Sequence, residues 1–210
     1  MKWIKLFSNH KIPYYVYKLN KSDSIILCKK YNKKHKSLII LYGSIYVVKI
    51  FSNQEQIPIV ILNKDNIFTN IEKQNKSYYK LIALEKTYIA TFQINIFQSR
   101  HINHSLTINI IKNYDKTLEK YEIMNEIINQ KYLKNRVLQL ILSICLQFGI
   151  IKNNKVYIPF KLSQDNIAAM TGTTKTTVNK IMKIIYKKKI IEYSNKKTIS
   201  INYILNLNFK

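Results

Sequence analysis

The chain has 210 residues, a length that suits two modest domains or one compact domain with a smaller one. Hydrophobic residues make up 47% of the sequence, which excludes a disordered basic tail. A formal net charge of +24 at pH 7 favours a polyanionic partner, but lysines run through every segment and only Arg100 and Arg136 are arginines. Because Asn, Ile, Tyr and Lys are abundant and Gly is scarce, as an AT-rich coding sequence imposes, charge alone does not establish nucleic-acid binding.

Several classes of protein are excluded by residues that the sequence lacks. Cys28 and Cys145 are far apart and form no C-x-x-C pair, which excludes an iron–sulfur cluster and a redox pair. His101 and His104 lack the acidic neighbours of a metal site, and no Ser/His/Asp set or Gly-rich phosphate loop indicates an enzyme. No stretch is apolar enough to span a membrane, and the N-terminal segment resembles neither a secretory leader nor a transit peptide. With the AT-rich composition, this predicts a plastid (chloroplast stroma), with a bacterial cytoplasm as the alternative.

The first hundred residues are predicted to form an antiparallel β-roll or barrel. Short runs rich in Ile, Val, Tyr and Leu alternate with Asn, Lys, Asp and Gly at the spacing of strands and turns. Gly43 lies between two of these runs, where a tight turn needs a glycine. The six predicted strands are Ser24–Cys28, Ser37–Leu41, Ser44–Phe51, Pro58–Leu62, Tyr78–Leu84 and Thr87–Gln93.

A long amphipathic helix is predicted over Asn103–Asn135. Its apolar residues recur at alternating spacings of three and four, the a/d pattern of a helix that packs against a partner helix. A single Asn at such a position, here Asn125, fixes the register between the two helices. The alternative is an amphipathic helix that lies on its own β-domain. The predicted seam residues are Ile111, Tyr114, Leu118, Tyr121, Asn125, Ile128 and Tyr132.

The segment that follows is predicted to be a winged helix. Leu133–Phe148 forms a buried helix with Gly149 at its C-terminal cap, and Val156–Phe160 forms a short strand whose end is weakened by Pro159. Two further helices follow, and then IIEYSNKKTISI alternates across a four-residue loop as a hairpin. In the helix Leu133–Phe148, the side chains expected to be buried are Val137, Leu138, Leu140, Ile141, Ile144, Cys145 and Leu146.

The stretch Leu162–Ile185, LSQDNIAAMTGTTKTTVNKIMKII, has the residue types of a helix-turn-helix. Ser163 is the predicted N-cap of the first helix, and Thr173 or Thr174 caps the second. Gly172 lies in the turn, where a left-handed backbone favours glycine. The apolar sides of the two helices are expected at Ile167, Ala168, Met170, Val178, Ile181, Met182 and Ile185.

The other side of the second helix carries groups that contact base edges and phosphates in a major groove. Lys187, Lys188 and Lys189 are placed to meet phosphates together with lysines of the hairpin. An ordinary helical hairpin with a solvated lysine face is the alternative. Double-stranded DNA is the predicted partner, and the predicted contacts are Ser163, Thr173, Thr174, Lys175, Thr176, Thr177, Asn179, Lys180, Lys183, Lys196 and Lys197.

In the order of its parts the chain resembles the Crp/Fnr family of dimeric transcription regulators. The segments RVLQLILSICLQFGI, LSQDNIAAMTGTTKTTVNKIMKII and KKKIIEYSNKKTISI carry the resemblance. Within the family the chain is most similar to the NtcA-type nitrogen-control branch of cyanobacteria and some red-algal plastids. The family's two recognition-helix arginines fall on Lys175 and Lys180, which keep the charge but lose the bidentate fork that reads guanine most selectively.

The resemblance implies an α+β fold in three parts. They are a β-roll effector-type domain over 1–103, similar to cyclic-nucleotide-binding domains, a dimerisation helix over 104–133, and a winged helix-turn-helix over 134–210. It also implies a homodimer, formed through the helix around 107–132, on a two-fold-symmetric DNA site. RNA polymerase is a further candidate partner.

For an effector the resemblance implies less. The stretch NIFTNIEKQNKSYYKLIAL has neither the Gly-Glu pair nor the Arg of the cyclic-nucleotide relatives, which excludes cAMP. The nitrogen-control members bind 2-oxoglutarate through backbone amides after a Phe and through two arginines, whose places hold Ser77 and Thr117 here. Without an arginine partner, 2-oxoglutarate would depend on Lys80, Lys116 or backbone donors, and the alternative is a roll that has lost its ligand. The candidate effector contacts are Phe68, Thr69, Asn70, Ile71 and Glu122.

Two other function classes are compatible with the sequence. An architectural or replication protein would use the winged helix with little sequence preference and with a steep salt dependence. A structural dimer would owe its basic surface to composition, and its DNA affinity would survive replacement of Lys175 and Lys180 by Ala. We expect instead a sequence-specific transcription factor without catalytic activity.

Overall fold

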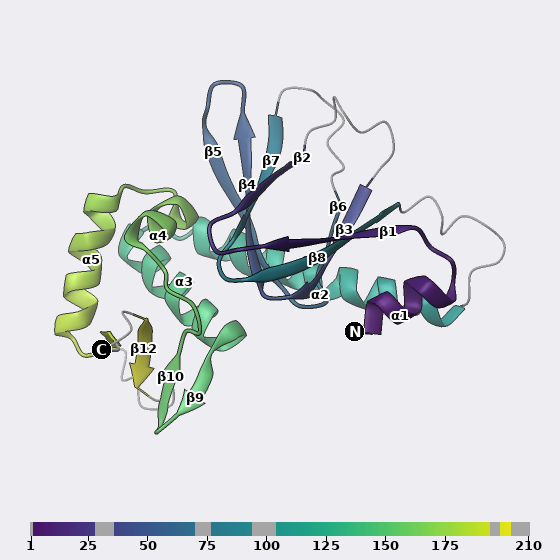
Figure 1. Ribbon diagram of the computed structural model, residues 1–210. Coiled ribbons are helices and arrows are strands. Elements are labelled where there is room, and N and C mark those ends of the chain that lie inside the picture. The colour runs from purple at the N-terminus through teal and green to yellow at the C-terminus, as the bar shows by residue number, and fades with distance from the viewer. Residues whose placement is uncertain (1, 28–35, 70–76, 94–103, 194–197, 203–210) are drawn as a thin grey trace. The chain divides into compact units, whose positions relative to one another are not determined.

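The computed structural model describes residues 2–27, 36–69, 77–93, 104–193 and 198–202 (Figure 1). The chain divides into two compact units, Met1–Glu122 and Ile123–Lys210. The finer division into three parts stays a prediction. Within the described ranges, no helix has both the length and the apolar character needed to cross a membrane.

Two four-stranded antiparallel sheets form most of the first unit (Figure 1). Along one sheet the strand order is β1-β8-β3-β6, and along the other it is β2-β7-β4-β5. All six predicted strands are present, and β4 and β8 have the predicted bounds, so the antiparallel β-domain is confirmed. The strands are β1 (Tyr14–Leu19), β2 (Ser24–Leu27), β3 (Lys36–Tyr42), β4 (Ser44–Phe51), β5 (Gln56–Asn63), β6 (Ile67–Thr69), β7 (Ser77–Ala83) and β8 (Thr87–Gln93).

The β1-β8-β3-β6 sheet buries side chains on both of its faces. Leu38 and Ile40 of β3 belong to the core between the two sheets, whereas Ile39 and Leu41 belong to a second core on the opposite face. A strand buried on both faces has a continuous apolar run instead of an alternating one. This explains the sequence LIIL at the centre of β3.

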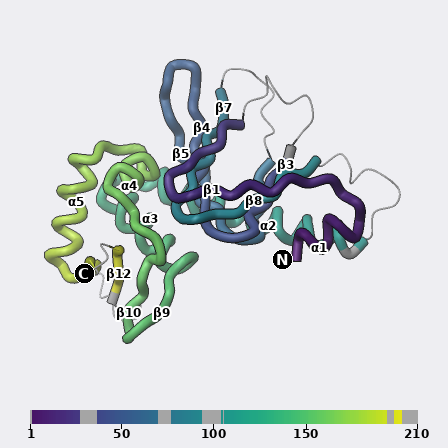
Figure 2. Tube along the Cα trace, viewed as in Figure 1, coloured from purple at the N-terminus to yellow at the C-terminus, as the bar shows by residue number. Residues whose placement is uncertain are grey.

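The second core is closed by α1 (Lys2–Asn9) and by the start of α2 (His104–Ile128). Phe7 of α1 is fully buried and its ring centroid lies 5.0 Å from that of Phe92 in β8. Leu106 of α2 is buried in the same core. Figure 2 shows the chain leaving α1 and running along β8 as β1. Neither α1 nor β1 was among the predicted elements.

Gly43 connects two strands that belong to different sheets. Its φ of +84° is left-handed, as a tight turn requires. However, β3 pairs with β8 and β6, whereas β4 pairs with β5 and β7, so Gly43 is not the turn of a hairpin. A Cβ at this position would lie 2.6 Å from the carbonyl oxygen of Lys86. The glycine therefore allows a close approach at the corner where the chain passes from one sheet to the other.

The long helix is confirmed as α2, but it ends at Ile128 rather than at Asn135. Nε of Arg136 donates a hydrogen bond of 2.8 Å to the carbonyl oxygen of Gln130. A side chain from the next helix thus satisfies a carbonyl just beyond the end of α2, where no intrahelical donor remains. Tyr132, predicted as a seam residue, lies outside α2 and is exposed.

The second unit is a winged helix in which a four-stranded sheet accompanies three helices. The strand order is β11-β12-β10-β9, and the predicted hairpin is confirmed by the antiparallel pairing of β11 with β12. The predicted helix Leu133–Phe148 has the observed bounds, whereas β9 was not predicted and β10 ends before Pro159. The elements are α3 (Leu133–Phe148), β9 (Ile150–Lys152), β10 (Lys155–Tyr157), α4 (Gln164–Thr171), α5 (Lys175–Lys187), β11 (Ile191–Tyr193) and β12 (Ile199–Asn202).

One expectation for α3 needs correction, and its predicted C-cap glycine has a spatial cause. Leu146, expected to be buried, is 71% exposed because α3 buries one side only. Gly149 is the C-cap residue as predicted, but its φ of −64° and ψ of 143° are extended rather than left-handed. A Cβ there would lie 2.1 Å from the carbonyl oxygen of Cys145 and 2.3 Å from Cγ1 of Val156. Space, and not backbone conformation, requires the glycine.

Candidate nucleic-acid interface

The first helix of the helix-turn-helix, α4, begins at a closed capping box. Ser163 Oγ accepts a hydrogen bond of 3.0 Å from the backbone N–H of Asn166, and Asn166 Oδ1 accepts one of 3.2 Å from the backbone N–H of Ser163. Ser163 is therefore the N-cap, as predicted. Its further role as a DNA contact stays a prediction.

The turn between α4 and α5 has the geometry that its glycine predicts. Gly172 is left-handed, with φ 62° and ψ 40°, and its backbone N–H donates to the carbonyl of Ala168. Thr174, and not Thr173, caps α5, because its Oγ1 accepts a hydrogen bond of 3.3 Å from the backbone N–H of Thr177. Glycine at the C-cap and threonine at the following N-cap together fix the crossing of the two helices.

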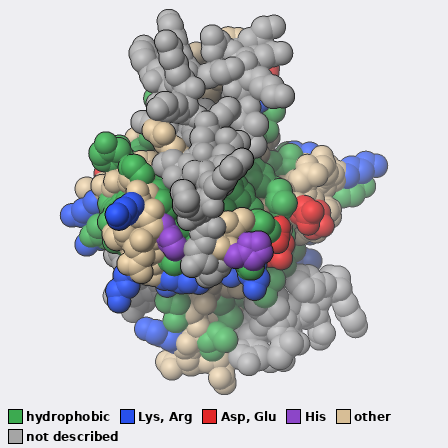
Figure 3. Space-filling view, turned by 90° about the vertical axis from the view of Figure 1, so that its right-hand side faces the viewer, with side chains coloured by type: hydrophobic (Ala, Val, Ile, Leu, Met, Phe, Trp, Pro, Cys, Tyr) green, Lys and Arg blue, Asp and Glu red, His purple; other side chains and the backbone are tan. Residues whose placement is uncertain are grey.

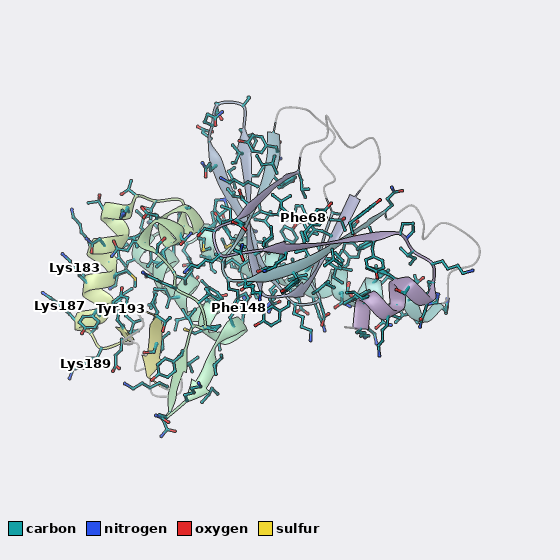
Figure 4. All side chains as sticks on the ribbon, in the orientation of Figure 1. Phe68, Phe148, Lys183, Lys187, Lys189 and Tyr193 are labelled. Carbon is teal, nitrogen blue, oxygen red and sulfur yellow. The ribbon has the colours of Figure 1, made fainter. Side chains whose placement is uncertain are left out.

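α5 is amphipathic, and its exposed side is the one predicted to face DNA. Thr176, Lys180 and Lys183 are exposed, and Asn179 and Thr177 are half-buried at the border of this side. Figure 4 shows Lys183 and Lys187 projecting from α5 on its outer side. The inward side is buried as predicted, at Ile167, Ala168 and Met170 of α4 and at Val178, Ile181, Met182 and Ile185 of α5.

Two of the predicted base contacts are held by α4, which the sequence did not indicate. Lys175 Nζ lies 3.0 Å from Oδ2 of Asp165, with both side chains more than 60% exposed. Gln164 Nε2 donates a hydrogen bond of 3.4 Å to Oδ1 of Asn179. An exposed ion pair contributes roughly 0–1 kcal/mol, so the Lys175 ammonium exchanges partners readily. The amide contact orients Asn179 with its NH₂ group free of this bond.

The end of α5 and the hairpin form a second basic part of this unit. Lys155 of β10 pairs with Glu192 of β11, and this hydrogen bond raises the pKa of Lys155. The ring centroids of Tyr186 in α5 and Tyr193 in β11 are 5.9 Å apart, and Figure 4 labels Tyr193. Lys196 and Lys197, predicted at the tip of the wing, lie outside the described residues.

The two glycines of this unit are expected to respond differently to alanine. Gly172→Ala meets no atom within 4 Å and incurs only the strain of a left-handed residue, about 1 kcal/mol. Gly149→Ala drives a methyl group into backbone and is expected to cost about 3 kcal/mol or more. Urea unfolding followed by far-UV circular dichroism measures both, and equal losses would contradict the packing role of Gly149.

Comparison with known proteins gives consistent matches. The model of the Crp-like helix-turn-helix domain matches residues 135–207. The chain is 25% identical over 208 residues to the HTH-type transcriptional regulator ycf28 of Porphyra purpurea, an alignment that covers 94% of this chain and 82% of that protein. It is 23% identical over 163 residues to the global nitrogen regulator of Nostoc sp. (strain PCC 7120), with 75% and 73% covered. A CRP-family transcriptional regulator of Thermus thermophilus has the same fold, with a TM-score of 0.69 at 14% identity over 91% of this chain and 92% of that one.

The chain therefore contains a Crp-like helix-turn-helix domain, and over most of its length it is similar to transcriptional regulators of the Crp/Fnr type. The predicted resemblance to Crp/Fnr regulators and the predicted fold class are thereby confirmed. α5 is the second helix of the matched helix-turn-helix, and the proteins that the chain resembles are transcriptional regulators.

The region predicted to hold an effector contains a closed set of hydroxyl groups. Thr69 Oγ1 lies 2.7 Å from Ser37 Oγ and 2.5 Å from the hydroxyl of Tyr114 on α2. Phe68 is buried in the core between the sheets, where Figure 4 places it, and its ring is edge-on to Tyr79. The hydroxyl groups therefore join α2 to strands β3 and β6 without a ligand.

A backbone N–H of β6, that of Ile67, is also hydrogen-bonded to α2. The N–H of Ile67 donates a hydrogen bond of 3.0 Å to Thr117 Oγ1, and this buried hydroxyl donates in turn to the carbonyl of Asn113 at 2.8 Å. Thr117 stands where the family resemblance places an arginine. Glu122 is exposed, and Asn70 and Ile71 lie outside the described residues, so the structure brings together only part of the predicted effector set.

The described residues offer no chemistry for a metal or a reactive thiol. No group of three or more His, Cys, Asp or Glu among them is placed to hold a metal ion, while His101 lies outside the described ranges. Burial raises the pKa of the Cys145 thiol to about 12, which keeps it protonated at neutral pH.

Proposed function

We propose that the protein is a sequence-specific DNA-binding regulator that acts as a homodimer and has no catalytic activity. The exposed basic side of α5 carries this proposal, because the apolar side of the same helix is fixed against α4 by buried side chains. A recognition helix must present a few rigidly placed side chains to base edges in the major groove. Residues 123–210 contain fifteen Lys or Arg but three Asp or Glu, which favours approach to a phosphate backbone.

Within this proposal the side chains of α5 divide into two roles. Lys175, Thr176, Asn179 and Lys180 read bases from the first two turns, and Lys183 with later lysines meets phosphates. Asn179 is preset by Gln164, so its NH₂ group is directed to an acceptor such as N7 of adenine. Thr173, Thr174 and Thr177 lie where a backbone phosphate approaches the start of the helix.

The proposed dimer interface is the side of α2 on which apolar side chains are exposed. Ile108, Ile111 and Leu118 are 46%, 54% and 58% exposed, and Asn125 continues the seven-residue spacing of the last two. Tyr114 and Tyr121, also predicted in the seam, are instead half-buried against the β-domain. We propose that the exposed stripe packs against its symmetry mate, with RNA polymerase as a later partner of the DNA-bound dimer.

The decisive experiment is a fluorescence-anisotropy titration across salt concentrations. The specific duplex carries GTA-N8-TAC, whose half-sites lie about one helical turn apart, and the control duplex is scrambled. We expect a preference of about a hundredfold, equivalent to about 2.7 kcal/mol. Equal affinities with a steep salt slope would instead favour the architectural alternative. Figure 3 shows basic side chains at several separate places on the face that it draws, as expected from lysines spread along the whole sequence.

Nitrogen control and a plastid location form the finer part of the proposal. They are supported by similarity to a global nitrogen regulator of Nostoc and to a regulator of the red alga Porphyra purpurea. The AT-rich composition agrees with the chloroplast stroma, with a bacterial cytoplasm as second choice. Loss of binding at promoters of nitrogen-assimilation genes, measured by footprinting on plastid DNA, would contradict the nitrogen role.

2-Oxoglutarate is the candidate effector that the resemblance to nitrogen-control regulators implies. We expect that the wild-type chain does not bind it. Thr117 supplies no cation for a carboxylate, and it already occupies the amide of Ile67. Isothermal titration calorimetry at millimolar 2-oxoglutarate should therefore give only dilution heat. A saturable heat, together with a ligand-dependent shift in DNA affinity, would show that Lys80, Lys116 or other donors replace the arginines.

A further inference from the structure

The first unit contains a cavity whose lining includes neither Tyr114 nor Thr117. Its volume is about 530 Å³, within the range of roughly 300–1,000 Å³ typical of small-molecule sites. It is formed by the start of α1, the end of β3, and the turns before β6 and β8. Its polar and aromatic lining residues are Lys2, Trp3, Tyr42, Lys64, Asp65, Lys86 and Tyr88.

The lining combines cations with aromatic faces. Tyr42 and Tyr88 lie with ring centroids 6.5 Å apart at an interplanar angle of 62°, and the ammonium group of Lys86 lies 5.7 Å from the Tyr88 centroid. Among the residues that the structure describes, neither Lys64 nor Lys86 forms a salt bridge. The cavity therefore offers positive charge beside rings that accept stacking.

The single carboxylate of the lining is already engaged. Asp65 Oδ1 accepts a hydrogen bond of 2.8 Å from the indole Nε1 of Trp3, whose side chain is 2% exposed. Asp65 also adopts a left-handed backbone, with φ 72°, at the turn before β6. This bond ties α1 to the turn and fixes one wall of the cavity. Three lysines against one engaged carboxylate leave the lining positive.

We propose that this cavity binds a small organic anion with a planar aromatic ring. The anionic group would lie between Lys64 and Lys86, and the ring would stack on one of the two tyrosines Tyr42 and Tyr88 and meet the other edge-on. A hydrocarbon would leave the ammonium groups without a counter-charge, and an inorganic anion would leave the aromatic faces unused. The two features together select an aromatic phosphate or carboxylate, at a site separate from both α5 and the hydroxyl groups that join α2 to β6.

Trp3 makes the proposal directly testable, because it is the only tryptophan of the chain and forms part of the wall. The full-length protein is titrated with AMP, with adenosine and with inorganic phosphate while Trp3 fluorescence is recorded. AMP is expected to give a saturable change in Trp3 fluorescence. Adenosine and phosphate should each bind at least about tenfold more weakly, because adenosine lacks the anionic group and phosphate lacks the ring. Absence of saturation with AMP, or equal binding of all three, would overturn the proposal.

Variants separate the cavity from other basic surfaces. Lys64→Gln and Lys86→Gln are each expected to weaken AMP binding about tenfold, whereas Lys134→Gln removes the same charge from α3 and should leave it unchanged. Equal weakening by all three would mean non-specific attraction to a basic protein. The readout does not depend on DNA binding, so failure here would leave the proposed regulator function intact, and failure of the DNA titration would leave this site intact.

Discussion

The double variant Lys175→Gln/Lys180→Gln is expected to lose at least about a hundredfold in affinity for the specific duplex. Each good base contact contributes about 1–3 kcal/mol of discrimination, and a decade of affinity is about 1.4 kcal/mol. Both side chains lie on the exposed side of α5, so little folding free energy is lost with them. The ion pair of Lys175 with Asp165 is exposed and contributes at most about 1 kcal/mol to stability.

The measurement is anisotropy on specific and scrambled duplexes, with a control that removes the same charge elsewhere. Lys134→Gln/Lys152→Gln alters two exposed lysines of the same unit, on α3 and β9. For the control we expect a small loss that is equal on both duplexes. If the α5 variant also loses affinity equally on the specific and the scrambled duplex, its lysines contact only the phosphate backbone. If it loses nothing, α5 is not the recognition helix.

Sequence reasoning succeeded where the deciding contacts are local. The N-caps Ser163 and Thr174 each accept a hydrogen bond from a backbone N–H three residues ahead. Gly172 is required by the left-handed backbone at its own position. Such requirements are readable from a short window because every partner lies within it. The bounds of α3 were predicted for the same reason, since a run of apolar residues begins and ends within the helix.

It failed where the partner is distant in the chain. β1 is an edge strand with four exposed residues in succession, so it lacks the alternating pattern of a strand, and it forms by pairing with β8 more than sixty residues later. The carbonyl of Gln130, just beyond the end of α2, is bonded by Arg136, which lies in the next helix. The contacts of Lys175 with Asp165 and of Asn179 with Gln164 join two helices and leave no periodic signal.

The periodicity of α2 supported two interpretations, and the structure divides the residues between them. Tyr114 and Tyr121 are partly buried against the β-domain, as expected of a helix that covers its own domain. Ile111 and Leu118 are more than half exposed, as expected of a helix that packs against a partner helix in a dimer. Spacings of three and four place both sets on adjoining stripes, so periodicity alone could not separate them.

Leu118→Glu should therefore separate the two copies without unfolding either. In a two-fold seam each Leu118 meets its symmetry mate or a close neighbour, and two buried glutamates without partners would repel. We expect the wild-type chain to be dimeric at micromolar concentration and the variant to be monomeric, as measured by analytical ultracentrifugation. Because a dimer binds two half-sites at once, DNA affinity should fall by roughly 10²–10⁴.

Lys116→Glu is the matched control, since it also introduces a glutamate at an exposed position of α2 but outside the stripe of Ile108, Ile111 and Leu118. It should remain dimeric, and its reversed charge should reduce DNA affinity only slightly. Unfolding midpoints of both variants should match the wild type at low concentration, because Leu118 is 58% exposed in the single chain. A Leu118→Glu protein that stays dimeric with full DNA affinity would place the dimer interface elsewhere and make the exposed stripe of α2 a solvated surface.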